Sequence, residues 1–258
     1  MSDDKDIISK VEKWINEEGY PLEMKVANAF RANGFEVLQS YYYQDPENNT
    51  LREIDMVAIA PEFTGITNIR FVVECKSSKK KPWVLFSSEH TLVNFNRLFS
   101  YCVNSDEARS ALIDMGIDEF MDLPWMRKSS RIIYGLTQAF TNGPDATYTA
   151  STSVLKSAIS IKRDLKNKRY SDFIFIFPVI VFEGTIFECY MGNDGRLSLQ
   201  EFERGDYFFR VEIDGEVGTC IHILNSKCLS EFAKEAKNVA NSLISLLKEK
   251  AQQKLKNI

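Results

Sequence analysis

Two helices are predicted at the start of the chain, because apolar residues there recur every three or four positions. The first covers residues 6–18 and ends at Gly19. The second begins at Pro21, whose missing amide hydrogen is tolerated in the first turn of a helix, and Gly34 follows it as a natural cap. The chain therefore opens with a pair of helices.

Strands are predicted next, from short runs that alternate or that are rich in β-branched and apolar residues. They cover residues 35–43, 53–60 and 69–76. Turn-forming residues at 61–65 would join the last two strands. If these two strands pair as a hairpin, their polar side chains converge.

The later segments mix both patterns. In chain order they are a mainly helical segment (82–124), a strand (131–137), a helix (151–165), an apolar strand (173–182), three short strands (near 185–190, 207–213 and 219–224) and a helix over roughly the last 30 residues. Pro178 predicts that the apolar strand is interrupted or lies at an edge of the sheet. Without an internal repeat, a linker or a change in composition, one α/β domain over residues 1–258 is the simplest organisation.

Composition narrows the class of protein. A chain of 258 residues with 44% hydrophobic and 26% charged residues is ordinary for a globular protein and buries a core without metals or disulfides. No run approaches the roughly 20 apolar residues of a membrane span, and the acidic start is unlike a signal or transit peptide. Five cysteines without a CxxC pair indicate reduced thiols, so we expect a cytoplasmic protein that does not enter a membrane.

Charge and histidine content restrict the chemistry. The formal net charge of −4 argues mildly against a protein coated with basic residues for nucleic acid. The two histidines, His90 and His222, disfavour mechanisms that need a histidine base or several histidine ligands. A catalytic site in this chain is therefore expected to use carboxylates and lysines.

Charged residues interrupt two of the apolar strands. Asp55 lies within one, and Glu74 and Lys76 lie two positions apart in the other, so that they project from the same face. Charges inside a buried strand are unfavourable unless they are paired or bind a metal. In a hairpin, Asp55 and Glu74 would meet, and two carboxylates with a backbone carbonyl suit Mg²⁺. A lysine beside them can help to deprotonate a water molecule and to neutralise charge during phosphodiester hydrolysis.

Simpler interpretations stay open for these residues. An acid two positions before a lysine is common by chance. Asp55 fits a charge on an edge strand equally well, and Glu74 with Lys76 fits a solvated ion pair. The apolar flanks, the hairpin order and a helical acid upstream, Glu23, favour the functional interpretation.

The segment from the second helix to Trp83 resembles the PD-(D/E)XK nuclease superfamily, which has the restriction-endonuclease-like fold. The resemblance lies in a helix that carries Glu23, a strand that carries Ile54-Asp55 and a further strand that carries Glu74-Cys75-Lys76. Ile54 stands where the family's name has proline. The resemblance is strong over about the first third of the chain, and the rest of the chain is compatible with it.

The resemblance implies a function, a site and a fold. Asp55 and Glu74 would bind Mg²⁺, or Mn²⁺ in its place, with the backbone carbonyl of Cys75. Lys76 would be catalytic and Glu23 would support the site. The activity implied is that of a metal-dependent endonuclease acting on DNA, in prokaryotic defence or genome maintenance.

The fold implied is a restriction-endonuclease-like mixed β-sheet flanked by helices, with helical insertions and a long C-terminal helix. The catalytic core would cover about residues 20–170, and the strands and helix of residues 171–258 would pack on it. Cutting both strands of DNA with one site per chain would require a homodimer.

Residues around the site are candidates for contacts to nucleic acid. Lys79, Lys80 and Lys81 follow it and can contact phosphates, although lysines often form only a solvated surface. Gln138, after the strand at 131–137, is placed to reach the substrate in a nuclease of this shape. Two other functions stay open, namely a catalytically silent nucleic-acid-binding or assembly module and an interaction protein that self-associates through its C-terminal helix.

Overall fold

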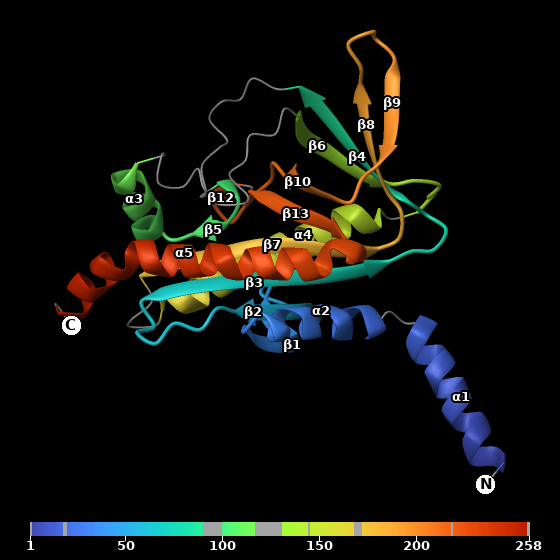
Figure 1. Ribbon diagram of the computed structural model, residues 1–258, viewed down its shortest axis with the longest axis horizontal. Helices are drawn as coiled ribbons and strands as arrows, with labels where there is room; N and C mark the ends of the chain where they lie inside the picture. Colours follow the sequence, from blue (N-terminus) through green and yellow to red (C-terminus); the bar gives the residue numbers. More distant parts are fainter. Residues whose placement is uncertain are drawn as a thin grey trace.

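The structure is a computed structural model, and it describes residues 2–17, 20–89, 100–116, 131–143, 145–167, 172–217 and 219–256. A large mixed β-sheet forms the centre of the molecule (Figure 1). The described α-helices are α1 (Ser2–Glu17), α2 (Tyr20–Ala32), α3 (Asp106–Met115), α4 (Ala146–Lys166) and α5 (Leu229–Leu255). Helices lie on both faces of the sheet, so the protein belongs to the mixed α/β class with a long C-terminal helix.

The strands of the first half of the chain include the segments that carry the candidate residues. These strands are β1 (Glu36–Gln44), β2 (Leu51–Ile59), β3 (Thr67–Ser77), β4 (Trp83–Glu89), β5 (Val103–Asn104) and β6 (Arg131–Gln138). The later strands are β7 (Phe173–Glu183), β8 (Ile186–Met191), β9 (Leu197–Glu201), β10 (Arg204–Phe208), β11 (Glu212–Ile213), β12 (Glu216–Val217) and β13 (Cys220–Asn225). The predicted hairpin is confirmed, because β2 and β3 pair antiparallel.

The order of the strands places segments from distant parts of the chain next to one another. The order is β1-β2-β3-β7-β13-β10-β6-β4-β8-β9, and β5 pairs with β7. The first three strands form an antiparallel meander, whereas β3, β7 and β13 run parallel. A parallel strand with both faces covered is apolar nearly throughout, as β7 is from Phe173 to Phe182. The centre of the sheet therefore depends on contacts between residues about a hundred positions apart.

Two apolar cores lie on opposite faces of the sheet. One is closed by α2, α3 and α5 and contains Phe71 stacked on Phe177, with ring centroids 4.9 Å apart. The other is closed by α4 and contains Trp83 stacked on Phe182, with centroids 4.3 Å apart. Each core excludes water from one side of β3, so charged residues on that strand are costly unless they have partners.

Several sequence predictions need correction. Pro178 neither interrupts β7 nor lies at an edge, since β7 has partners on both sides. Along one edge of β7, Phe175 and Ile176 pair with β5, and the pairing with β13 starts at Val179. Pro178, which has no amide hydrogen, therefore lies between these two pairings. The predicted helical segment 82–124 instead begins with β4, and its residues 90–99 and 117–124 lie outside the described residues.

The other element boundaries differ less. Helix α4 begins at Ala146, five positions before the predicted start, because Asp145 caps it by accepting a hydrogen bond from the Thr147 amide. The strand predicted at 207–213 is divided between β10 and β11. Gly34 has φ +76°, as expected of a residue that ends a helix in the left-handed region.

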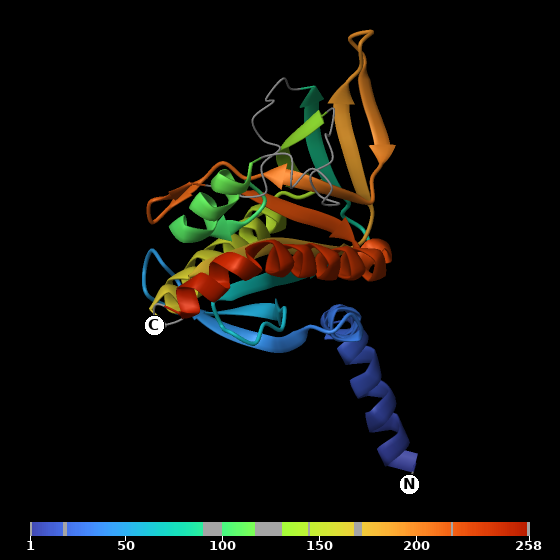
Figure 2. The ribbon, with the colours of Figure 1, turned by 60° about the vertical axis from the view of Figure 1, so that its left-hand side comes forward.

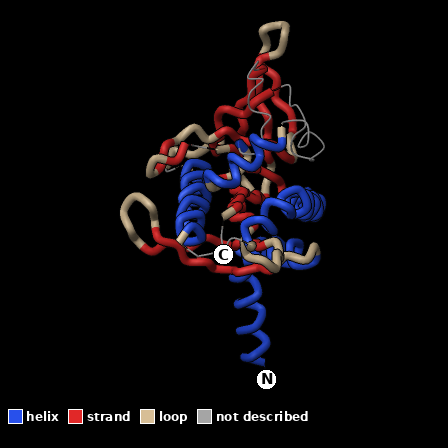
Figure 3. Tube along the Cα trace, turned by 90° about the vertical axis from the view of Figure 1, so that its left-hand side faces the viewer, coloured by secondary structure: helices blue, strands red, loops and turns tan. Residues whose placement is uncertain are grey.

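Helix α1 projects away from the rest of the molecule (Figures 2 and 3). Its apolar residues Ile7, Ile8, Val11 and Trp14 are all exposed. In the described part of the chain, no helix has the length and apolarity needed to cross a bilayer.

Candidate functional site

The site lies where the alternation of side chains along β1 and β2 is broken. Ile54 and Met56 are two positions apart on β2, yet they pack into opposite cores. The pairing of β1 with β2 omits the pair between them, Ser40 and Asp55, and Ser40 has φ +48°. A local irregularity of this kind redirects a side chain. It turns Asp55 towards the neighbouring strand β3.

Asp55 is held against the backbone of β3. The Cys75 amide donates a hydrogen bond to Asp55 Oδ2, with an N···O distance of 2.6 Å. The Cys75 side chain packs into the core closed by α2, α3 and α5, so its thiol points away from Glu74 and Lys76. Burial raises the pKa of the Cys75 thiol well above its usual value, so the sulfur is not a nucleophile at neutral pH.

Glu74 and Lys76 form an ion pair on the face of β3 that is covered by α4, opposite the Cys75 side chain. Lys76 Nζ lies 2.5 Å from Glu74 Oε1. Glu74 is only 6% exposed, while a third of the Lys76 side chain reaches solvent. The lysine of this pair is therefore accessible to solvent, whereas the carboxylate is buried.

Burial and like charge perturb every acid of the cluster. Burial raises the pKa of Glu74 to about 7, with Asp55 adding to the rise and Lys76 opposing it. The pKa of Asp55 is raised by burial, in spite of the Cys75 amide and Lys76, and that of Glu23 is raised by burial and then by Asp55 and Glu53. Burial acts to lower the pKa of Lys76, but Glu74 outweighs it and the pKa rises. The structure thus brings the four predicted residues into one electrostatic cluster.

Ser153 is a member of the site that the sequence did not reveal. It lies on α4, and its hydroxyl donates a hydrogen bond of 3.3 Å to Glu74 Oε2. Its carbonyl accepts a bond of 3.4 Å from the Tyr43 hydroxyl. Serine in an amphipathic helix carries no signal of such a contact, so only the packing of α4 on β3 identifies it.

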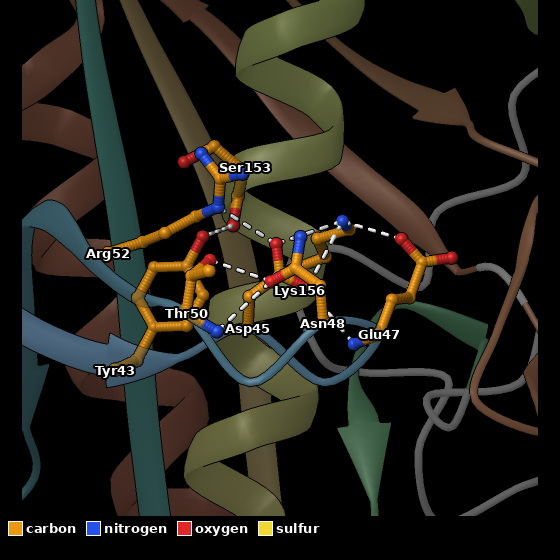
Figure 4. Close-up of polar contacts among 8 residues, drawn as sticks. All are labelled: Tyr43, Asp45, Glu47, Asn48, Thr50, Arg52, Ser153 and Lys156. Atoms are coloured by element: carbon orange, nitrogen blue, oxygen red, sulfur yellow. Dashed lines mark hydrogen bonds and ion pairs between the residues drawn. The ribbon is translucent and has the colours of Figure 1, made fainter.

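A second polar cluster fixes the tip of the β1–β2 hairpin to α4 (Figure 4). Asp45 is completely buried, and its Oδ2 lies 2.8 Å from Arg52 Nε and 3.0 Å from Lys156 Nζ. Lys156 also lies 2.5 Å from the Glu47 carboxylate. Since Lys156 is one helical turn after Ser153, the hairpin and the Glu74 carboxylate are held by the same face of α4.

The predicted lysines lie beside the site, in a depression that we call the basic groove. It has a volume of about 750 Å³ and is lined by the end of α1, the start of α2 and the turns that follow β3 and β7. Its lining residues are Asn16, Pro21, Leu22, Lys25, Ser77, Ser78, Lys79, Lys80, Lys81, Glu183, Gly184 and Thr185. Leu22 and Ser77 are the chain neighbours of Glu23 and Lys76, so the backbone connects the groove directly to the cluster, although none of the four cluster residues is among its described lining residues.

Gln138 lies next to the turn that carries the lysines. It is paired with Trp83 at the start of β4, and the amide of the following residue, Ala139, donates to the Pro82 carbonyl. Among the described residues, no hydrogen bond joins Gln138 to Glu74 or to Lys76. Its predicted contact with a substrate stays a prediction.

Metal binding was tested against the donor atoms of the cluster. In the described parts of the chain, no group of three or more His, Cys, Asp or Glu side chains is arranged to hold a metal ion. The donor types nevertheless suit Mg²⁺, since Asp55, Glu74 and the Cys75 carbonyl supply only oxygen. A buried carboxylate whose pKa is raised to about 7 also gains from a nearby cation. The residues fit such an ion by their chemistry.

The chain was compared with protein-family models, with curated proteins and with solved structures. None of them matches it. Any functional conclusion therefore has to be drawn from the side chains of the site.

Proposed function

We propose that the protein is a metal-dependent nuclease that hydrolyses phosphodiester bonds of DNA, on a restriction-endonuclease-like fold. One observation carries the proposal. Asp55, Glu74 and Lys76 meet around the backbone of Cys75, with Glu23 near enough to interact electrostatically, and the residues that flank them on β2 and β3 are mainly apolar and buried. Buried charge of this kind is costly for stability and is typical of functional sites.

Each residue has a role that follows from its surroundings. Asp55 and Glu74, with the Cys75 carbonyl, would hold Mg²⁺, which supplies Lewis-acid stabilisation of charge on the phosphate. Lys76, ionised and partly exposed, binds a phosphate oxygen and stabilises its negative charge. Glu23 keeps a raised pKa at the edge of the site and can accept a proton there. Ser153 orients the Glu74 carboxylate.

The surroundings of the site support a polyanionic substrate. The basic groove adjoins the cluster and brings four lysines close to it, although the whole chain has a net charge of −4. All five cysteines are free thiols, which supports action in a reducing compartment such as the cytoplasm. Two copies of the chain would be needed to cut both strands of a duplex with one site each.

The test is cleavage of supercoiled plasmid DNA in the presence of Mg²⁺ or Mn²⁺. We expect nicking by the wild-type protein and a loss of roughly 100-fold or more in Asp55→Asn and in Lys76→Ala. Glu201→Gln, which changes an exposed acid on the edge strand β9, is the matched control and should cleave like the wild type. Cleavage that survives both site substitutions would exclude this site.

A catalytically silent DNA-binding module is the second candidate. It is favoured by the internal contacts of the carboxylates, since Glu74 Oε1 is bonded to Lys76 and Asp55 Oδ2 to the Cys75 amide. This alternative predicts DNA binding without cleavage under any divalent metal. It also predicts that Asp55→Asn leaves both DNA affinity and Mn²⁺ binding unchanged.

A further inference from the structure

The basic groove is lined by charged side chains from α2 and from the turns that follow β3 and β7. Lys25, Lys79, Lys80 and Lys81 line it, and among its described lining residues Glu183 is the one carboxylate. Lys25 Nζ lies 3.0 Å from Glu183 Oε1, whereas no described carboxylate pairs with the other three lysines. The groove therefore has a net positive charge, and most of this charge is available to a ligand.

The walls of the groove are preformed. The Ser78 amide donates to the Glu183 carbonyl and the Trp83 amide donates to the Thr185 carbonyl, each at 3.0 Å. These bonds hold the turn with the three lysines at both of its ends. Gly184 allows the close approach, since a Cβ atom there would lie 2.5 Å from the Ser78 carbonyl oxygen. Binding of a ligand would therefore not carry the entropic cost of ordering this turn.

Two exposed aromatic rings lie on α1 and α2, the helices that contribute Asn16, Pro21, Leu22 and Lys25 to the lining of the groove. Trp14 is 52% exposed and Tyr20 is 47% exposed, and their ring centroids are 5.8 Å apart. Trp14 lies two positions before Asn16, and Tyr20 directly precedes Pro21, both of which line the groove. The faces of two exposed rings are available to stack on another ring system.

We infer that the basic groove binds single-stranded DNA, with its phosphates on the lysines and a base stacked on Trp14 or Tyr20. Lysines that follow a backbone, together with exposed aromatic faces, are the two components of single-strand recognition. In a duplex the bases stack on one another, so the aromatic faces contribute only when bases are unpaired. This inference rests on the proposed function and specifies the form of its substrate.

The test measures binding separately from cleavage. Fluorescein-labelled oligothymidylate, the same backbone without bases, and a blunt hairpin duplex are titrated into the full chain with EDTA present. We expect the protein to bind the single strand tightest. Trp14→Ala with Tyr20→Ala should weaken that binding by roughly 10-fold or more while leaving affinity for the abasic strand unchanged.

Charge and stacking are separated by the salt dependence. Lys79→Ala with Lys80→Ala removes two lysines that no described carboxylate neutralises, and should reduce the slope of log K against log salt by about 1.4, since each phosphate contact to a single strand contributes about 0.7. Ile7→Ala is the matched control, because it removes another exposed apolar residue of α1 at a distance from the groove. Trp14→Phe should restore affinity, and circular dichroism checks that α1 stays folded.

Three results would overturn the inference. The first is equal affinity of the protein for duplex and for single-stranded DNA. The second is that Ile7→Ala weakens single-strand binding as much as the Trp14→Ala, Tyr20→Ala double variant does. The third is that the double variant changes the oligomeric state of the protein but not its affinity for the single strand. The last result would show that the rings cover a second copy of the chain. The binding test contains EDTA and no metal, so its result does not depend on whether the protein cleaves DNA. Conversely, the cleavage assay with Asp55→Asn tests the proposed nuclease site even if single-strand binding is absent.

Discussion

Glu74 makes the stability of the protein depend on pH, and the size of this effect follows from its surroundings. Burial raises the pKa of Glu74 from 4.5 to about 7. A carboxyl group whose pKa is raised on folding stabilises the folded state fully below pH 4.5, and this contribution is lost as the pH rises through about 7. This rise in the pKa of Glu74, at about 1.36 kcal/mol for each tenfold change in proton affinity, corresponds to about 3 kcal/mol.

Glu74→Gln isolates this contribution because glutamine has the same shape and does not titrate. We expect the free energy of unfolding of the wild type to fall, relative to the variant, by about 3 kcal/mol between pH 4.5 and about pH 8. Urea denaturation without divalent metals measures this difference, and Glu201→Gln is the control with an exposed acid. A difference between wild type and Glu74→Gln that stays constant over this range would refute the reasoning.

Two further substitutions test the framework of the site. Lys156→Met removes a cation from the buried Asp45 carboxylate, so we expect urea denaturation to show a free energy of unfolding lower by about 2 kcal/mol. Lys156→Arg should retain most of the stability. An unchanged free energy of unfolding in Lys156→Met would contradict the role of this contact. Gly184→Ala forces a Cβ atom against the Ser78 carbonyl, and should lower Tm by about 5 °C and weaken DNA binding. Gly143→Ala, where a Cβ atom meets nothing within 4 Å, should change neither quantity.

Periodicity was sufficient to predict most elements that carry the site. The positions of α2, β1, β2 and β3 follow from apolar spacing and from Pro21 and Gly34, which act locally. Periodicity failed where partners from distant parts of the chain decide the structure. Pro178 is tolerated in the central strand β7 because β5 and β13 pair with different parts of one edge of β7 and leave Pro178 between them. No sequence pattern near Pro178 predicts that arrangement.

The candidate site shows the same limit. Asp55, Glu74 and Lys76 were visible in the sequence because charge is conspicuous in apolar strands. Ser153 was not, since a serine on a helix is ordinary. The break at Ser40 was not visible either, because a left-handed conformation outside glycine leaves no mark on the composition of the strand.

The contacts that hold α4 to the hairpin have a consequence for synthesis of the chain. Tyr43 and Ser153 are separated by 110 positions, and Asp45 and Lys156 by 111. When the ribosome has made only the first three strands, β3 still exposes an apolar edge and Glu74 has no helix to cover it. The site thus assembles late, after β7 has left the ribosome, and until then the nascent chain exposes the apolar edge of β3.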